Sequence, residues 1–283
     1  MKNFFLISIL ILGLFGANSV QAFSISPLKF TATLGPGDTK DWEVKVTNNS
    51  NQPSTFFPVV IGMKQDIMGR SIFDKNIDVA ESWFKTPIGS ISLAPGESAN
   101  EIFSISVPAN TPPGAHYLGL AIQEKNDQVL SAQLATVLNL QISGLAKESL
   151  LLEKFLISKK IFLDKNWLAE MQMKNIGNVS VNLEGKAELY YFQQKFSEQS
   201  VNLGNAVFAQ SVRSANLNYF PNNKMAWPGF YRGDITVIYG ATHQTTAQSV
   251  NFWYFPRWFF VVFGLIILLI IVFVFKKNKN VAV

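Results

Sequence analysis

Apolar and polar residues alternate along much of the chain between residues 23 and 254. Trp42, Val44 and Val46 alternate with Glu43, Lys45 and Thr47, and Phe103, Ile105 and Val107 alternate with Ser104 and Ser106. Successive side chains of a β-strand point to opposite faces, so this period of two predicts half-buried strands. Helical spacing is rare. Only Ser149–Lys160 could be taken for a helix, and we interpret it as the first strand of a second domain.

The same alternation continues in the second half of the chain. It is carried by Trp167, Ala169, Met171 and Met173, and again by the segment Val179–Tyr191, with the turn residues Asn175–Asn178 between them. Short strands separated by turns are typical of antiparallel sandwiches. We therefore predict an all-β protein with two tandem immunoglobulin-like β-sandwiches, over residues 23–145 and 146–254, followed by a transmembrane helix.

The amino-terminal residues 1–22 have the composition of an export signal. Lys2 precedes the apolar run Phe4–Phe15, and Val20-Gln21-Ala22 places small residues where a signal peptidase cleaves. Phe23 is then the first mature residue. The alternative is an uncleaved membrane anchor, although such a short run would hardly cross a bilayer. Both interpretations predict an exported chain.

A second apolar stretch, Trp258–Phe275, contains no charged residue. As a helix it would rise roughly 27 Å, close to the thickness of the hydrocarbon layer. Trp253, Tyr254, Phe255 and Trp258 resemble an interfacial aromatic belt, and Lys276, Lys277 and Lys279 follow the span as the positive-inside rule requires. We predict a transmembrane helix over residues 255–275, a cytoplasmic tail over 276–283, and both sandwich domains outside the membrane.

The net charge of +5 does not indicate a nucleic-acid partner. Its surplus lies in Lys2, Arg257 and the three terminal lysines, whereas the segment between residues 23 and 256 holds 19 basic and 19 acidic residues. The excess is therefore a topology signal rather than a basic stripe. The chain has no cysteine, so its exported domains must be stabilised by hydrophobic cores rather than by disulfides.

The sequence offers little from which to build a catalytic or metal centre. His116 and His243 are the two histidines, and neither has a second ligand at a suitable spacing. We interpret His116 as structural, with a proton or ligand role as the alternative, and His243 as solvated. Asp74–Asp78 matches the opening of a calcium loop, but Val79 and Lys85 occupy positions that require Gly and Glu. We expect no enzyme activity, cofactor or metal.

Two aromatic residues are candidates for a binding surface. If alternate residues of Val179–Tyr191 point inward, Tyr190 and Phe192 share the outer face with charged neighbours, where large apolar side chains are unexpected. They could bind a partner or contact the neighbouring domain. Trp42 is expected in the core because of its alternation.

Several motifs of the first half occur in a recognisable order. They are Phe23–Pro27, Val44–Asn48, Ser82-Trp83, Leu93–Ser98, Ile105–Ala109 and Pro113–Tyr117. This order resembles the bacterial WxL-interacting protein family in its peptidoglycan-binding immunoglobulin-like domain. The resemblance covers roughly residues 23–145 and implies that Trp83 is a core residue. In the second half it is limited to scattered points, such as Lys174–Asn178 and Trp227–Tyr231.

The resemblance implies a non-catalytic cell-surface protein that links the membrane to the wall by binding peptidoglycan, surface proteins or both. The first half is also loosely similar to pilus-chaperone domains, which donate a strand to a fibre subunit. The alternative function is therefore a membrane-tethered, chaperone-like assembly factor for surface fibres or secreted proteins. A receptor is less well supported, because the tail of eight residues is too short for a signalling domain.

Overall fold

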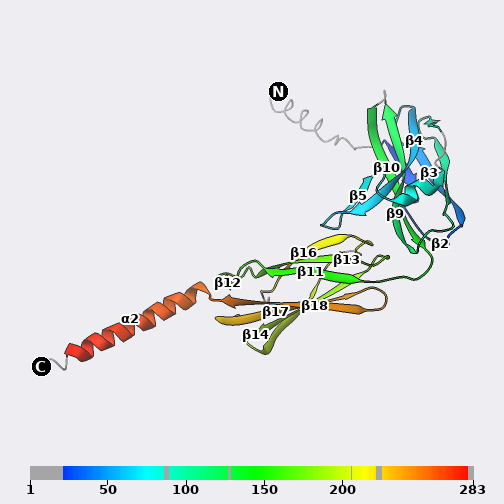
Figure 1. Cartoon of the computed structure of the whole chain (residues 1–283). Helices are drawn as coiled ribbons and strands as arrows, with labels where there is room; N and C mark the ends of the chain where they lie inside the picture. Colours follow the sequence, from blue (N-terminus) through cyan, green and yellow to red (C-terminus); the bar gives the residue numbers. More distant parts are fainter. Residues whose placement is uncertain (1–21, 86–88, 127–128, 205, 221–224, 280–283) are drawn as a thin grey trace, which may run out of the picture. The chain divides into compact units, whose positions relative to one another are not determined.

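The computed structural model describes residues 22–85, 89–126, 129–204, 206–220 and 225–279. The chain forms two compact units (Figure 1). Of the described residues, the first unit contains 22–63, 73–85, 89–111, 116–126 and 129–140, and the second contains 64–72, 112–115 and those from 141 to 279. The predicted signal peptide lies outside the described residues, except for Ala22.

The first unit contains strands of two sheets. One sheet has the order β1 (Phe23–Ser26), β3 (Thr39–Asn48), β8 (Ser98–Ser106) and β6 (Phe84–Lys85). The other has the order β2 (Lys29–Leu34), β10 (Val129–Ile142), β9 (Gly114–Asn126), β4 (Ser54–Gln65) and β5 (Ser71–Asp74), and β7 (Ile91–Leu93) also pairs with β4. A short 3-10 helix, η1 (Val79–Trp83), precedes β6.

The alternation in the sequence is reproduced in the burial of these strands. In β3 the side chains of Trp42, Val44 and Val46 are buried while Glu43 and Lys45 are exposed. β3 and β8 are antiparallel, with Trp42 opposite Phe103, so the inward residues of both strands meet on one face. Trp42 is therefore a core residue, as predicted.

The second unit is also a pair of sheets. A three-stranded sheet has the order β11 (Leu150–Ile157), β13 (Leu168–Asn175) and β16 (Val212–Asn218), and a five-stranded sheet has the order β12 (Ile161–Phe162), β18 (Gln244–Tyr254), β17 (Gly229–Tyr239), β14 (Leu183–Tyr191) and β15 (Gln194–Val201). The strand predicted within Ser149–Lys160 is confirmed as β11. The strand predicted from Val179 begins only at Leu183, and Val181 before it forms an isolated bridge with Val207. The fold class is all-β, as predicted.

The core of the second unit is built around Trp167. This side chain is fully buried, and its indole N–H donates to the carbonyl oxygen of Asp164 at 2.9 Å. Five aromatic rings lie within 4.8–6.5 Å of it between centroids: Phe162, Phe220, Tyr231, Phe252 and Tyr254. Tyr254 therefore belongs to the core and not to the predicted aromatic belt.

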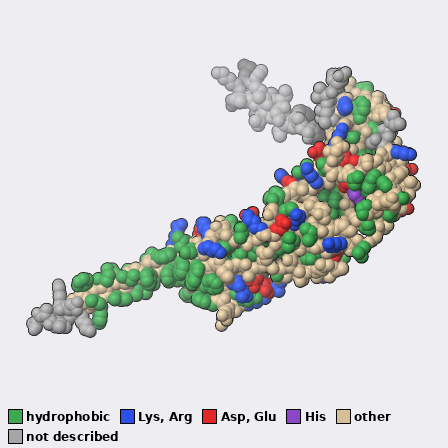
Figure 2. Space-filling model, viewed as in Figure 1, with side chains coloured by type: hydrophobic (Ala, Val, Ile, Leu, Met, Phe, Trp, Pro, Cys, Tyr) green, Lys and Arg blue, Asp and Glu red, His purple; other side chains and the backbone are tan. Residues whose placement is uncertain are grey.

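One helix follows the second sandwich. α2 (Arg257–Lys279) begins three residues after the end of β18, and its residues Arg257–Lys276 are long and apolar enough to cross a membrane. From Phe260 to Phe275 its side chains are exposed, and Figure 2 shows them as a continuous hydrophobic surface. An exposed apolar helix of this length is typical of a membrane span. Of the predicted topology residues, Trp258 lies in its first turn and Lys276, Lys277 and Lys279 lie in its last turns.

Candidate functional site

The first unit has an open sheet edge along the beginning of β10. Phe56, near the start of β4, pairs with Glu124, near the end of β9. β10 also begins at this end of the sheet, directly after β9. β1 also begins at this end, since Phe23 pairs with Asn48 just before the loop to β4. β2 continues from β1 and therefore runs away from this end of the sheet. β10 runs in the same direction, so β2 is parallel to β10.

β2 covers only the second part of β10. The N–H of Val137 donates to the carbonyl oxygen of Leu28 at 3.0 Å, and the Thr136 hydroxyl donates to that of Pro27 at 2.7 Å. β2 begins at Lys29 and continues toward the far end of the strand. Among the described residues, β2 is the strand on this side of β10. Because Leu28, just before β2, lies beside Val137, residues 129–135 of β10 extend beyond the start of β2. An unbordered stretch of this kind presents free N–H and C=O groups to another chain.

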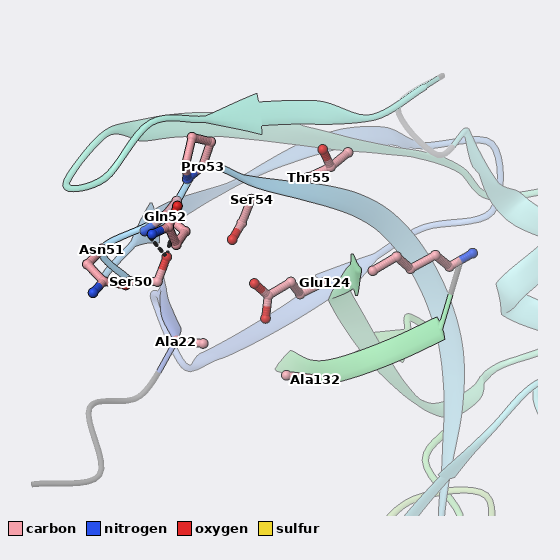
Figure 3. Close-up of a pocket in the computed structure, with 10 residues that line it drawn as sticks. Ala22, Ser50, Asn51, Gln52, Pro53, Ser54, Thr55, Glu124 and Ala132 are labelled. Atoms are coloured by element: carbon pink, nitrogen blue, oxygen red, sulfur yellow. Dashed lines mark hydrogen bonds between the residues drawn. The ribbon is translucent and has the colours of Figure 1, made fainter. Parts of the chain in front are cut away.

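A cleft of about 770 Å³ lies next to this edge (Figure 3). Its wall comes from Ala22, which is the last residue of the predicted signal peptide, from the loop between β3 and β4 with the start of β4, and from β9 and β10. The lining residues are Ala22, Ser50–Thr55, Glu124, Lys125 and Ala132. The close-up shows the Glu124 carboxylate directed into the cleft, on the same side as Ser54. Glu124 is 4% exposed, so it presents a largely buried carboxylate at the base of a polar opening.

The loop of the cleft is shaped by one buried side chain, Asn48. Its amide nitrogen donates to the carbonyl oxygens of Gln52 and Leu93, both at 2.9 Å. Its amide oxygen accepts from the backbone N–H and the hydroxyl of Ser50, at 2.9 and 2.7 Å. Because all these groups are satisfied locally, the loop holds a defined shape beside the open edge.

A second polar group of the first unit joins His116 to Asp78. His116 lies in β9, and its Nδ1 is 2.7 Å from Oδ1 of Asp78, which also accepts from the N–H of Ala80 as the N-cap of η1. Burial alone would raise the pKa of Asp78, but the hydrogen bonds from His116 and Ala80 outweigh burial and lower this pKa. Asp78 thus fastens η1 to β9.

This arrangement clarifies three sequence interpretations. The imidazole of His116 packs edge-on against Trp83, with 4.8 Å between centroids, which fits the structural role expected for it. Trp83 itself is only half-buried, so the core position that the resemblance implied is wrong. Asp78, in the incomplete calcium loop, caps a helix. Among the described residues, no cluster of three or more His, Asp or Glu could hold a metal ion.

The two aromatic candidates, Tyr190 and Phe192, lie in the second unit. Tyr190 is on the outer face of β14, where its hydroxyl donates to Glu188 at 3.0 Å and the Arg232 guanidinium lies 4.4 Å from the ring centroid. Phe192 does not continue the strand as predicted. It forms the turn after β14 with a positive φ of 52° and is 53% exposed.

The two candidates have different surroundings. Tyr190 borders a cluster of charged residues in which Lys186 and Lys195 both bind Glu188 and Glu198. Hydrogen bonds from Lys195 and then Lys186 lower the pKa of Glu188 to about 2. Phe192, by contrast, lines an apolar pocket with Tyr191 and Phe230. His243, in the turn between β17 and β18, is exposed as expected.

Neither the open edge of β10 nor the role of Glu124 is predictable from the sequence. The edge depends on where β2 docks, and β2 precedes β10 by about a hundred residues. The buried Glu124 follows the apolar residues Leu118–Ile122 of β9. A carboxylate at the end of such a buried run was the only signal in the sequence.

No family model and no curated protein matches the chain. Among solved structures, a chain of the chaperone–tip adhesin complex of CFA/I fimbriae is similar at 12% identity and a TM-score of 0.43, covering 84% of this chain and 100% of that one. A chain of the CsuC–CsuE pre-assembly complex from Csu pili of Acinetobacter baumannii gives 12% and 0.39, covering 83% and 100%. A protein of unknown function from Porphyromonas gingivalis gives 13% and 0.32, covering 83% and 99%. Similarity this weak carries no functional argument, so function must be argued from the residues themselves.

Proposed function

We propose that this chain is a membrane-anchored, non-catalytic binding protein of the exported space, which holds extended segments of other exported proteins at the open edge of β10. The observation that carries this proposal is the stretch of residues 129–135, which β2 leaves unbordered. An added strand would form main-chain hydrogen bonds with any extended sequence, and side-chain pockets would supply selectivity. This function corresponds to the chaperone-like assembly factor considered above.

The direction of the backbone groups supports this proposal. The N–H of Val137 points toward β2, and alternate residues of a strand direct their N–H groups to the same side. The N–H groups of Gln133 and Ala135 therefore point to the open edge. The Asn48-ordered loop and the cleft beside Ala132 leave room for the side chains of an incoming segment.

The membrane helix gives this binding activity a location. The helix would hold the protein in the membrane from which exported chains emerge, with Lys276, Lys277 and Lys279 on the cytoplasmic side. An assembly factor needs no reacting groups, only an accessible edge and a fixed position.

A matched pair of substitutions tests the proposal. Gln133→Pro removes an outward N–H, a change that an edge strand tolerates, whereas Gln133→Ala keeps it. The probe is a ten-residue peptide of alternating valine and threonine, and its binding to the full chain in nanodiscs is measured by interferometry. We expect Gln133→Pro to weaken binding about 2- to 10-fold, the effect of one backbone hydrogen bond, and Gln133→Ala to leave binding unchanged. Equal binding by both variants, or no binding to the wild-type chain, would refute the strand-addition proposal.

Wall attachment is the second candidate, favoured by the polar lining of the cleft. Hydroxyl, amide and carboxylate groups of Ser54, Gln52 and Glu124 face a volume large enough for a sugar unit. Co-sedimentation of the full chain with purified peptidoglycan tests it. Retention at moderate salt that Glu124→Gln lowers and Gln133→Pro leaves unchanged would favour the wall linker over the assembly factor.

A further inference from the structure

A row of apolar side chains crosses the five-stranded sheet of the second unit at the end nearest α2. Phe230 of β17 pairs with Trp253 of β18, and Trp253 pairs with Ile161 of β12. On the other side of β17, the N–H of Phe192 donates to the carbonyl oxygen of Phe230 at 3.0 Å. Four segments that are far apart in the sequence thus place Ile161, Phe192, Phe230 and Trp253 in one line, here called the apolar row.

The apolar row lies on the outer face of the sheet. Its neighbours Tyr231, Phe252 and Tyr254 point inward and are buried, so the alternate residues point outward. Ile161, Phe192 and Trp253 are 54%, 53% and 44% exposed. Large apolar side chains that remain this exposed in a contiguous group indicate a surface that is covered in the working protein.

The rest of this face is mostly polar, apart from the half-buried Ile238 at the far end of β17. One position further along the strands, Tyr190 and Arg232 interact with each other, and beyond them lie the charged residues around Glu188. The far end of β18 carries Thr245, Ala247 and Ser249 on the same face. The exposed large apolar side chains of this face are therefore concentrated at the end next to the helix.

The short link between β18 and α2 keeps the apolar row close to the helix. Only Phe255 and Pro256 separate β18 from the helix, so Trp253 lies no more than about 14 Å along the chain from Arg257. Ring contacts continue across this junction, because Trp253 stacks on Phe255 at 5.8 Å and Phe255 contacts Phe259 at 5.5 Å. Figure 2 shows the hydrophobic surface of the helix continuing onto this end of the unit.

Another exposed aromatic side chain, Trp227, lies near the start of α2. Trp227 is 52% exposed and its ring lies 6.5 Å from that of Trp258, in the first turn of α2. Tryptophan and tyrosine favour the headgroup layer, where an apolar ring and a polar N–H or O–H are both satisfied. The surface that adjoins the span thus has the composition of an interfacial surface.

We infer that the apolar row lies in the headgroup layer of the bilayer that α2 crosses, so that the second unit rests on the membrane by its own sheet. The occupant is lipid, because the surface is continuous with a membrane span through a link of two residues. Phe192, found as an unexplained aromatic in the sequence, is one of the groups that contact lipid. This inference depends on α2 as a span and not on the partner bound at β10.

The absence of cysteine from the chain allows a direct test with single-cysteine variants. Spin labels are attached to Phe192→Cys and Ile161→Cys, to Ala247→Cys at the polar end of the same face, and to Val262→Cys within the helix. The full chain is placed in nanodiscs of equimolar phosphatidylethanolamine and phosphatidylglycerol at one chain per disc. Circular dichroism checks that each variant is folded.

The measurement compares collision of each label with oxygen, which is concentrated in lipid, and with a water-soluble nickel chelate. We expect the labels at 192 and 161 to prefer oxygen, as does the label at 262, and the label at 247 to prefer the chelate by at least several-fold. Equal accessibility of the labels at 192, 161 and 247 would overturn the inference. Shielding that appears only at two chains per disc would also overturn it, because a second copy would then cover the row.

Discussion

Both units are pairs of β-sheets, but the side chains that pack between the sheets differ. Trp167 anchors the second unit, with five aromatic rings around it, and its single polar atom is satisfied by Asp164. The first unit has a core of mainly aliphatic residues such as Leu118 and Leu120, and it uses buried polar side chains to shape its loops and ends. Both units also shape a loop with a buried asparagine, Asn48 in the first and Asn175 in the second, so the difference lies in the core, where ring packing dominates only in the unit that precedes α2.

The two units also differ in the kind of surface that each leaves exposed. In the first unit, Asn48 orders the loop beside the open edge of β10, and Asp78 fastens η1 to β9. In the second unit the accessible surface is a sheet face with apolar and charged regions.

The largest expected effect comes from Trp167→Ala. Removal of this ring leaves a cavity among the aromatic side chains and should lower the free energy of unfolding of the second unit by about 3–5 kcal/mol. Denaturant unfolding of the full chain in detergent micelles, followed by circular dichroism, measures it. Trp253→Ala, at an exposed position, should cost about 1 kcal/mol or less. A loss of stability confined to the first unit would contradict the assignment of Trp167 to the core of the second unit.

The packing of the second unit can also be tested by adding a methyl group to its core with Gly233→Ala. An added Cβ would lie 2.8 Å from Cζ of the buried Tyr219, so the ring would have to shift. We expect a loss of about 1–3 kcal/mol in the same unfolding measurement. Gly264→Ala is the control, because no atom lies within 4 Å of its added Cβ. Equal stability of both variants would show that the aromatic core has room to adapt.

The polar framework of the first unit is tested by Asp78→Asn. The substitution keeps an acceptor for the Ala80 N–H but removes the charge that faces His116, and it should cost about 1–2 kcal/mol at neutral pH. The folded state lowers the pKa of Asp78 below its ordinary value of 3.8. The contribution of the ionised group is therefore complete above that value and is lost as pH falls through the lower pKa of the folded state.

Unfolding of wild-type and Asp78→Asn chains at a series of pH values measures this effect. The gap in stability between the two should narrow below pH 3.8. A gap that stays constant down to acid pH would mean that the charge of Asp78 contributes nothing to the stability of the first unit.

The smallest effect is expected for Glu188→Gln. The lysine contacts of Glu188 lie on an accessible face, so their loss should cost less than about 1 kcal/mol, and added salt should reduce the cost further. The pKa of Glu188 is lowered to about 2 in the folded protein. The contribution of its charge to the free energy of unfolding should therefore disappear only as pH falls from about 4 toward that value. Thermal unfolding at low and high salt measures it. A large, salt-independent loss would show that charges contribute to the second unit as much as rings do.

The alternation of residues was sufficient to predict the strand interiors. Trp42, Ala169, Met171 and Met173 were read as inward residues, and all four are buried. Prediction was weaker at strand ends, where a turn overrides the period: Phe192 lies in a turn with positive φ, and the strand expected from Val179 starts at Leu183. Tyr254 was assigned to the interface because it neighbours Trp253, although the same alternation places it inside.

The all-β class, the inward faces of the strands and the apolar helix could be predicted from the sequence, because each follows from a local pattern of side chains. The tertiary structure decided the open edge of β10, the union of Asp78 with His116 and the apolar row that joins Ile161, Phe192, Phe230 and Trp253. These features depend on which distant strands pair and in which register. Strand pairing is set by the packing of the whole sandwich, which the local period of two does not specify.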